Sequence, residues 1–189
     1  PSPVPWDADA LFSYLHDGWH PDHGTARGPM AHVVANLASV DPDDVRAIAT
    51  YMAGVFGPPA TDRRHDAKNV LAEVKPMADR ASETNRGGAS IYVAACASCH
   101  ESGRALPYGG INLALSTAIS SPDPRNLANI VLAGISPREG ERSPIMPGFA
   151  GSMNDDQIVA VLTYVRARFS TQPAWTGVYL VVTVGRREQ

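Results

Sequence analysis

The stretch Cys96-Ala97-Ser98-Cys99-His100 decides how the rest of the sequence is interpreted. Two cysteines separated by two residues and followed directly by histidine form the attachment motif of c-type haem. Within one helical turn, each thiol can bond covalently to one haem vinyl group. The histidine beside the second thiol is then held beneath the iron as an axial ligand. We therefore expect Cys96 and Cys99 to anchor one haem c and His100 to bind its iron.

Three other uses of paired cysteines fit the sequence less well. Thiol–disulfide oxidoreductases also use Cys-x-x-Cys, but this interpretation requires a βαβ context and leaves His100 without a role. A structural zinc site usually needs four Cys or His ligands, and the chain has no second Cys-x-x-Cys pair. A disulfide across so short a loop would add little stability. Haem attachment is the interpretation that uses all three residues.

The second axial ligand should lie downstream of the motif, where the chain has two methionines and no further histidine. Met146 lies between Pro144 and Pro147, and proline restricts the backbone so that a loop can present one side chain to the iron. Met153 precedes a predicted helix, where methionine usually fills the core. We expect Met146 to bind the iron, giving the His/Met ligation that raises the potential. Met153, an upstream histidine and an open position remain as alternatives.

Four segments have the pattern of α-helices, so the sequence predicts an all-α fold. These segments are residues 41–53, 87–99, 123–134 and 154–169. The third opens with an Asp-Pro pair that is typical of a helix start and closes at Gly134. In the fourth, apolar residues recur at helical spacing. The valine-rich run 178–184 instead predicts a β-strand, followed by a polar end.

An internal repeat links the two halves of the chain. Residues 39–51 align without gaps on residues 152–164, with identical serine, aspartate, alanine, threonine and tyrosine residues. Each copy follows a methionine next to a proline, Met30 in the first and Met146 in the second. Residues 1–56 therefore look like the second half of a haem-binding module without its attachment motif. Met30 is the candidate ligand of a second haem if that module is completed; otherwise it lies in the core of a helical appendage.

The remaining part of the first half is less informative. Residues 57–87 are rich in charged residues and proline and predict a linker, with a helix near residues 66–74. Four histidines lie on either side of Met30: His16, His20, His23 and His32. In so loop-rich a segment we expect these histidines to face solvent or haem propionates. Metal or haem binding is the alternative.

Composition excludes several classes of protein. The 189 residues are 44% hydrophobic and 19% charged, which suffices for one domain and an additional piece. A net charge of −3 and a pI of about 6.1 argue against nucleic-acid binding. No apolar run approaches the ~20 residues that cross a bilayer, and the first residues lack a signal-peptide pattern. We expect no transmembrane helix.

The haem motif, the Met146 loop and the final helix resemble the class I cytochrome c fold, in which an N-terminal helix crosses a C-terminal one. Here that contact would involve Gly88, Tyr92 and Tyr164. Other segments resemble the last haem domain of three-haem cytochrome subunits of periplasmic dehydrogenases. These segments are Leu113-Ala114-Leu115-Ser116-Thr117-Ala118, Pro122-Asp123-Pro124-Arg125-Asn126-Leu127, Met146-Pro147-Gly148-Phe149-Ala150, Tyr164-Val165-Arg166-Ala167-Arg168-Phe169 and Pro173-Ala174-Trp175. Residues 24–51 are similar to the methionine-bearing half of the second haem domain.

The resemblance implies a haem c electron-transfer protein that carries one covalent haem and is not itself an enzyme. The implied electron donor is a dehydrogenase subunit of the molybdenum hydroxylase type (oxidising isoquinoline or nicotinate), the aldehyde dehydrogenase type or the quinoprotein alcohol dehydrogenase type. The implied acceptor belongs to the respiratory chain. Because haem c is attached outside the cytosol, we expect a processed or trimmed bacterial periplasmic protein, with peripheral membrane association at most. A stand-alone haem enzyme or sensor with an open iron site is the alternative.

The expected organisation is a partial module at 1–56, a linker at 57–87, a cytochrome c domain at 88–172 and a tail at 173–189. Two features depart from the family. Many class I cytochromes orient the ligand histidine through a Pro-Leu-Ala-Gly segment, whereas the matching stretch here is Ile111-Asn112-Leu113-Ala114. We therefore expect the carbonyl of Pro107 or Gly110 to hold the His100 ring. After Trp175 the tail no longer resembles the family, in which another short helix would follow.

Overall fold

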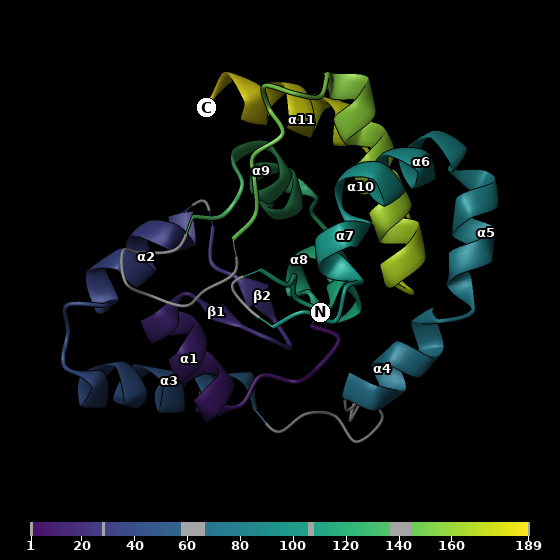
Figure 1. Ribbon diagram of the computed structural model, residues 1–189. Helices are drawn as coiled ribbons and strands as arrows, with labels where there is room; N and C mark the ends of the chain where they lie inside the picture. Colours follow the sequence, from purple (N-terminus) through teal and green to yellow (C-terminus); the bar gives the residue numbers. More distant parts are fainter. Residues whose placement is uncertain (1, 28, 58–66, 106–107, 137–144, 189) are drawn as a thin grey trace.

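The computed structural model describes residues 2–27, 29–57, 67–105, 108–136 and 145–188. These residues are mostly helical, and the one sheet among them is an antiparallel hairpin of β1 (Trp19–His20) and β2 (Gly24–Thr25). The helices are α1 (Ala8–Asp17), α2 (Pro29–Leu37), α3 (Pro42–Phe56), α4 (Ala67–Val74), α5 (Met77–Thr84), α6 (Arg86–Ala95), α7 (Ala97–His100), the 3-10 helix η2 (Leu113–Leu115), α8 (Thr117–Ser120), α9 (Arg125–Ala133), α10 (Asp155–Phe169) and α11 (Val178–Arg187) (Figure 1). The predicted all-α fold is confirmed.

Capping contacts explain where the predicted helices begin and end. At the start of α10, Asn154 and Gln157 form a capping box in which each backbone N–H donates to the other side chain at 2.9 Å. At the start of α9, Asp123 Oδ1 accepts from the Arg125 N–H at 2.9 Å. Gly134, with φ of 73°, ends that helix. These residues satisfy backbone groups that a helix terminus leaves unpaired, which is why the sequence signals were informative.

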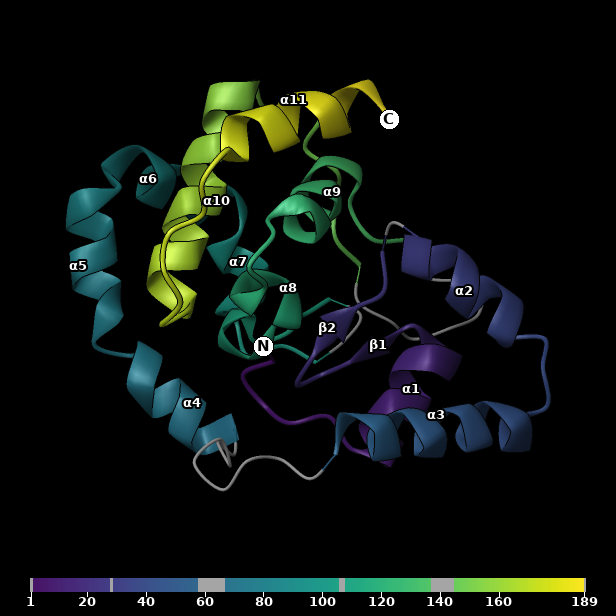
Figure 2. The same ribbon diagram turned by 180° about the vertical axis from the view of Figure 1, so that it is seen from behind.

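Two hydrophobic cores organise the chain. The fully buried side chains of the larger core are Tyr92, Ile119, Leu132, Ile158, Leu162, Tyr164 and Val182. The smaller core forms where α1 packs on α3, and it consists of Leu11, Leu15, Val45 and Ala49. Figures 1 and 2 show α1, α2 and α3 together on one side of the molecule and α5, α6 and α10 on the other. We call α1, α2, α3 and the hairpin the N-terminal unit.

The crossing of α6 and α10 holds the larger core together. A Cβ atom on Gly88 would lie only 2.7 Å from the Cβ of Tyr164 and nearer still to the backbone of Ala160. The ring centroids of Tyr92 and Tyr164 lie 5.4 Å apart beside this contact. The predicted contact of Gly88, Tyr92 and Tyr164 is therefore confirmed, and glycine is required because the two backbones nearly touch.

The internal repeat corresponds to two helices of equal length. α3 and α10 each contain 15 residues, and they begin and end at equivalent positions of the repeat. On α10 the face that carries Tyr164 is covered by α6, so Tyr164 is 1% exposed. The equivalent Tyr51 on α3 is 71% exposed among the described residues. The same helix face is thus covered in one copy and open in the other.

The described part of the predicted linker is largely helical. The helix expected near residues 66–74 is confirmed as α4, in which Val70 and Val74 are buried. No sequence pattern predicted α5, whose Ala81 is buried in the larger core. The charged residues of this segment lie mostly on exposed helix faces. Their number makes the few apolar residues between them hard to recognise as a helical pattern in the sequence. The division into domains with a linker at 57–87 stays a prediction, in which the segment contains two helices rather than one.

The predicted strand at 178–184 is also wrong, because the segment belongs to helix α11. Valine favours strands, but strand preference depends strongly on context. Val178, Val182 and Gly185 lie on one face of α11 and are buried against α9 and α10. Burial of this face outweighs the local preference for extended backbone. After Trp175 the chain does form a further helix, so this departure from the family disappears.

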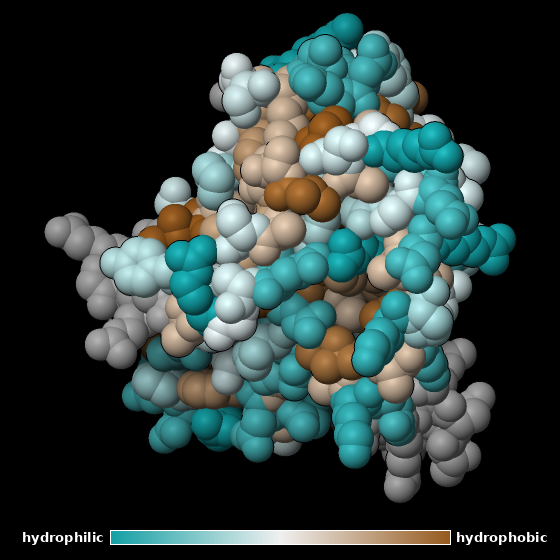
Figure 3. Space-filling model, turned by 45° about the vertical axis from the view of Figure 1, so that its right-hand side comes forward, coloured by the Kyte–Doolittle hydropathy of each residue, from teal (hydrophilic) through white to brown (hydrophobic). Residues whose placement is uncertain are grey.

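On the face shown in Figure 3, strongly hydrophobic residues lie singly or in small groups among polar ones. Among the described residues, no helix is both long enough and apolar enough to cross a membrane.

Replacing Gly88 by alanine is expected to lower the free energy of unfolding by about 1–3 kcal/mol, because the new methyl group would overlap α10. Gly87→Ala is the matched control, since nothing lies within 4 Å of a Cβ at that position. Alanine there should leave stability unchanged or raise it by up to about 1 kcal/mol. Chemical denaturation followed by far-UV circular dichroism measures both variants. Equal stabilities would contradict the close approach of α6 and α10.

Candidate haem site

The attachment motif lies where α6 passes into the single turn of α7. The Cys96 N–H donates to the Tyr92 carbonyl at 2.9 Å, and the His100 N–H donates to the Cys96 carbonyl at 3.0 Å. This turn places Cys96, Cys99 and His100 on the wall of one cavity. Both thiols are free, as covalent attachment of a haem requires. The helix predicted at 87–99 is confirmed in two parts, divided at the first cysteine.

The cavity has a volume of about 260 Å³ and a mainly apolar wall. Beside the motif, its apolar lining includes Leu127, Ile130, Val131, Met146, Phe149, Met153, Val161, Leu162 and Val165. Thr25 also lines it, and its hydroxyl oxygen is buried without a hydrogen-bond partner among the described residues. Such an orphaned hydroxyl usually indicates a missing polar partner. The site therefore fits haem, which joins a flat apolar ring to two carboxylate groups.

The environment of the cysteines disfavours the thiol-exchange alternative. Burial, with a smaller contribution from Cys99, raises the pKa of the Cys96 thiol to about 11. The thiolate is the nucleophile in thiol–disulfide exchange, and at neutral pH a thiol with this pKa is almost fully protonated. Among the described residues, no group of three or more His, Cys, Asp or Glu side chains is arranged to hold a metal ion.

A backbone carbonyl orients the His100 ring. His100 Nδ1 lies 3.1 Å from the Ile111 carbonyl oxygen, and because a carbonyl can only accept, Nδ1 carries the proton. Burial lowers the pKa of His100 despite the opposing effects of this hydrogen bond and of Glu101. The neutral ring then leaves Nε2 free to bind iron. A Cβ on Gly110 would lie 2.5 Å from His100 Nδ1, so the loop backbone lies directly against the ring.

The residue expected to accept the hydrogen bond of this ring needs correction. The acceptor is the Ile111 carbonyl rather than that of Gly110. Pro107, the other residue expected in this role, lies outside the described residues. The path of the loop explains this difference. Gly110 packs against the ring, and its N–H donates to the Cys99 carbonyl at 3.0 Å. The next carbonyl along the chain is therefore the one that reaches Nδ1.

Two backbone hydrogen bonds hold Met146 at the wall of the same cavity. Its N–H donates to the Ile135 carbonyl at 3.0 Å, and its carbonyl accepts from the Ile135 N–H at 2.8 Å. Gly134 allows this pairing, since a Cβ there would clash with the Met146 and Pro147 backbone. Of the two flanking prolines, Pro144 lies outside the described residues.

Met153 also lines the cavity, and it packs against the larger core. The cavity thus brings together His100 and both methionines that the sequence indicated. No upstream histidine lines it among the described residues. The choice of Met146 as the second ligand stays a prediction.

Sequence patterns gave no indication that the N-terminal unit contributes to the cavity wall. Thr25 reaches the wall from β2. The hairpin is held there because the Thr117 N–H donates to the His23 carbonyl at 3.0 Å. Ser2 Oγ lies 3.1 Å from Thr117 Oγ1 and 3.0 Å from His23 Nδ1. This contact joins segments far apart in the chain, which no local motif reveals.

The residues around Met30 differ from the expectation of exposed histidines. Met30 is half-buried and packs against the small core between α1 and α3. His23 is only 3% exposed and stacks on Trp6, with ring centroids 3.6 Å apart. The prediction that His23 faces solvent is therefore wrong, because Trp6 and Ser2 cover its ring from the N-terminal side. His32, by contrast, is exposed.

The buried His23 should make folding sensitive to acid. Burial, followed by the nearby His20, lowers its pKa to about 4, against a smaller opposing effect of Asp7. Between pH values of about 6.5 and about 4 the unfolded chain therefore binds more protons at this site than the folded chain. The stabilisation is complete above this range and is lost as the pH falls through it, by about 3 kcal/mol.

His23→Phe, which retains a ring against Trp6, should reduce the loss of stability between pH 7 and pH 4 relative to the unchanged protein. His32→Gln should retain that loss. Urea denaturation at several pH values measures the difference. An identical pH dependence in His23→Phe and the unchanged protein would show that His23 is not buried in its neutral form.

Comparison with known proteins agrees with the site. Residues 83–165 match the family model described as "Cytochrome C oxidase, cbb3-type, subunit III". One of the subunits of nicotinate dehydrogenase from Pseudomonas putida is 35% identical over 179 residues, which cover 93% of this chain and 14% of that protein. The gluconate 2-dehydrogenase cytochrome c subunit of Pantoea cypripedii is 30% identical over 175 residues, covering 85% of this chain and 37% of the relative. The fructose dehydrogenase cytochrome subunit of Gluconobacter japonicus is 28% identical over 186 residues, covering 89% and 38%.

The chain therefore spans only 14% to 38% of the length of these three relatives. The region matched by the family model contains the attachment motif, the helix crossing and all residues that line the cavity except Thr25. The relatives extend the similarity to the N-terminal unit as well. Residues 83–165 thus match a cytochrome family model, and most of the chain is similar to subunits of bacterial dehydrogenases, two of which are named as cytochrome subunits.

Proposed function

We propose that the chain transfers single electrons through one covalently bound haem c, with Cys96 and Cys99 bonded to the ring and His100 and Met146 as axial ligands. The observation that carries this assignment is the shared cavity, because the motif and Met146 line the same apolar space. When bound, haem supplies an iron that alternates between ferric and ferrous states. The chain's residues bury the ring, exclude water and hold the His100 ring through the Ile111 carbonyl.

This ligand set favours an electron carrier over the alternative of a stand-alone haem enzyme or sensor. An enzyme or sensor needs an open position on the iron for a substrate or gas. Here methionine side chains line the cavity together with His100, and methionine raises the potential of a haem without taking part in bond-making. The alternative would require Met146 to lie away from the iron.

The relatives indicate where the electrons come from. They are named for nicotinate, gluconate and fructose dehydrogenases, so the property they share is association with a dehydrogenase rather than one substrate. We infer that this chain accepts electrons from a dehydrogenase subunit, of the molybdenum hydroxylase or quinoprotein type, and passes them to a respiratory acceptor. It acts as the electron-carrying part of the complex, in the bacterial periplasm.

We also propose that residues 1–56 are the second half of a further haem-binding module. The repeat supports this origin, and so does the exposed face of α3 at Tyr51, which α6 covers on the equivalent helix α10. Met30 would serve as an iron ligand only where an attachment helix covers that face. Its present packing against the small core agrees with the alternative of a helical appendage. The cytochrome domain then spans residues 88–172, and the tail at 173–189 packs onto it through α11.

Met146→Ala should abolish the far-red absorption band of ferric iron–methionine ligation while the haem stays covalently attached, because the cysteines are unchanged. Met153→Ala is the matched control: it removes the same side chain from the same cavity and should retain the band. Visible spectra of the oxidised protein measure both variants, and carbon monoxide binding to the reduced protein should appear only in Met146→Ala. Loss of the band in Met153→Ala alone would contradict the ligand assignment. Carbon monoxide binding by the unchanged protein would support an open iron site instead.

A further inference from the structure

Helix α11 lies across the chain segment that follows Met146. Its Val178 and Val182 are buried in the larger core, and it packs against α9 and α10. At Gly185 the helix comes so close to α9 that a Cβ would lie 2.9 Å from Asn129 Oδ1 and 3.1 Å from Leu132 Cδ1. This close approach places the next residue, Arg186, over the end of the Met146 loop.

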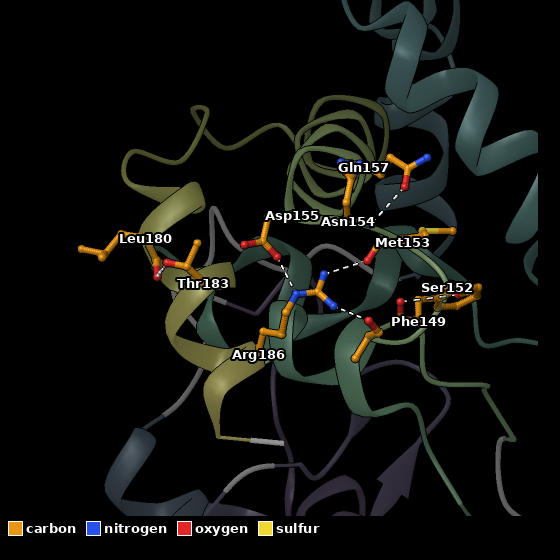
Figure 4. Close-up of polar contacts among 10 residues, drawn as sticks. Phe149, Ser152, Met153, Asn154, Asp155, Gln157, Leu180, Thr183 and Arg186 are labelled. Atoms are coloured by element: carbon orange, nitrogen blue, oxygen red, sulfur yellow. Dashed lines mark hydrogen bonds and ion pairs between the residues drawn. The ribbon is translucent and has the colours of Figure 1, made fainter.

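The Arg186 guanidinium joins three points on that segment (Figure 4). Nε donates to Asp155 Oδ1 at 2.5 Å, Nη2 donates to the Met153 carbonyl at 2.8 Å, and Nη1 donates to the Ala150 carbonyl. The Arg186 and Asp155 side chains are only 28% and 23% exposed, so solvent screens this ion pair less than an open surface pair. A planar guanidinium is suited to several fixed acceptors at once, which a lysine could not hold in the same geometry.

Among the described residues, the backbone hydrogen bonds that tie the loop between Met146 and α10 to other elements come from one part of the fold. Met146 pairs with Ile135, and the Phe149 and Ala150 N–H groups donate to the last turn of α9 at 3.0 and 3.2 Å. All of these contacts come from α9 and the residues just after it. Arg186 adds contacts from α11 to the Ala150 and Met153 carbonyls, which lie before α10. The loop is therefore tied to both α9 and α11, an arrangement that we call the clamp.

We infer that Arg186 is a positioning residue that keeps Met146 in place for iron ligation, by closing the loop from the α11 side. The inference rests on the proposed role of Met146 as an axial ligand. Without Arg186, the Ala150 and Met153 carbonyls and the Asp155 carboxylate lose their shared donor. The loop then leaves the iron more readily, so an external ligand displaces Met146 at a lower concentration.

The test is imidazole titration of the oxidised full chain, followed by loss of the far-red band. Arg186→Gln should bind imidazole about tenfold more tightly than the unchanged protein, since hydrogen bonds to charged groups are among the stronger ones in proteins. Arg187→Gln changes an exposed arginine of the same helix and should leave the affinity unchanged. Far-UV circular dichroism confirms that α11 is retained. A lower midpoint potential in Arg186→Gln alone is the second expected readout, because methionine ligation raises the potential.

The outcomes separate the two proposals. If the unchanged protein lacks the far-red band, the assignment of Met146 as a ligand fails. If the band is present and Arg186→Gln shows unchanged imidazole affinity and potential, the role of Arg186 fails. If Arg186→Gln does not fold, the same imidazole titration of Asp155→Asn tests the inference. This variant weakens the clamp by removing the charge that pairs with Arg186 but retains the arginine. A folded Asp155→Asn variant with unchanged imidazole affinity would then overturn the inference.

Discussion

The near contact of two helix backbones at Gly88 is the constraint on which the haem site depends. Because α6 lies directly on Ala160 and Tyr164 of α10, the position of the C-terminal end of α6 is fixed relative to α10. Cys96, Cys99 and His100 follow at that end and face a cavity whose opposite wall includes Val161 and Val165 of the same α10. A side chain at position 88 would separate the helices and with them the motif from its cavity. The position of the attachment motif in the fold thus depends on a packing contact between helices, which lies outside the motif.

Elements outside this crossing complete the site from three directions. The loop after the motif presents the Ile111 carbonyl to His100. The segment before α10 carries Met146 and is held between α9 and α11. The N-terminal unit closes the remaining wall with Thr25, and the contact between His23 and Thr117 holds it in place. A change in the N-terminal unit can therefore reach the haem environment without touching any ligand.

The features that were predictable from the sequence are those specified by residues close together in the chain. The attachment motif and the capped helices α9 and α10 each have a local physical signal, whereas the contact of Gly88 with α10 was indicated by the resemblance to class I cytochromes c. The features that were missed depend on which distant segment comes to lie nearby. α11 is a helix because one face of a valine-rich run is buried on α9 and α10, and α5 is ordered because Ala81 enters the larger core. His23 is buried because Trp6 stacks on it, and Ile111 rather than Gly110 holds His100 because of how the loop passes the ring. Sequence spacing carries no information on these long-range contacts.

The most direct test of covalent haem attachment is the intact mass of the purified chain after acid-acetone extraction, which removes haem that is not covalently bound. We expect the mass of the polypeptide plus one haem, and the mass of the polypeptide alone in a Cys96→Ser, Cys99→Ser double variant. An unchanged polypeptide mass for the native chain would contradict covalent haem attachment and with it the assignment of the cavity. Two haems per chain would contradict the proposal that residues 1–56 lack an attachment site of their own.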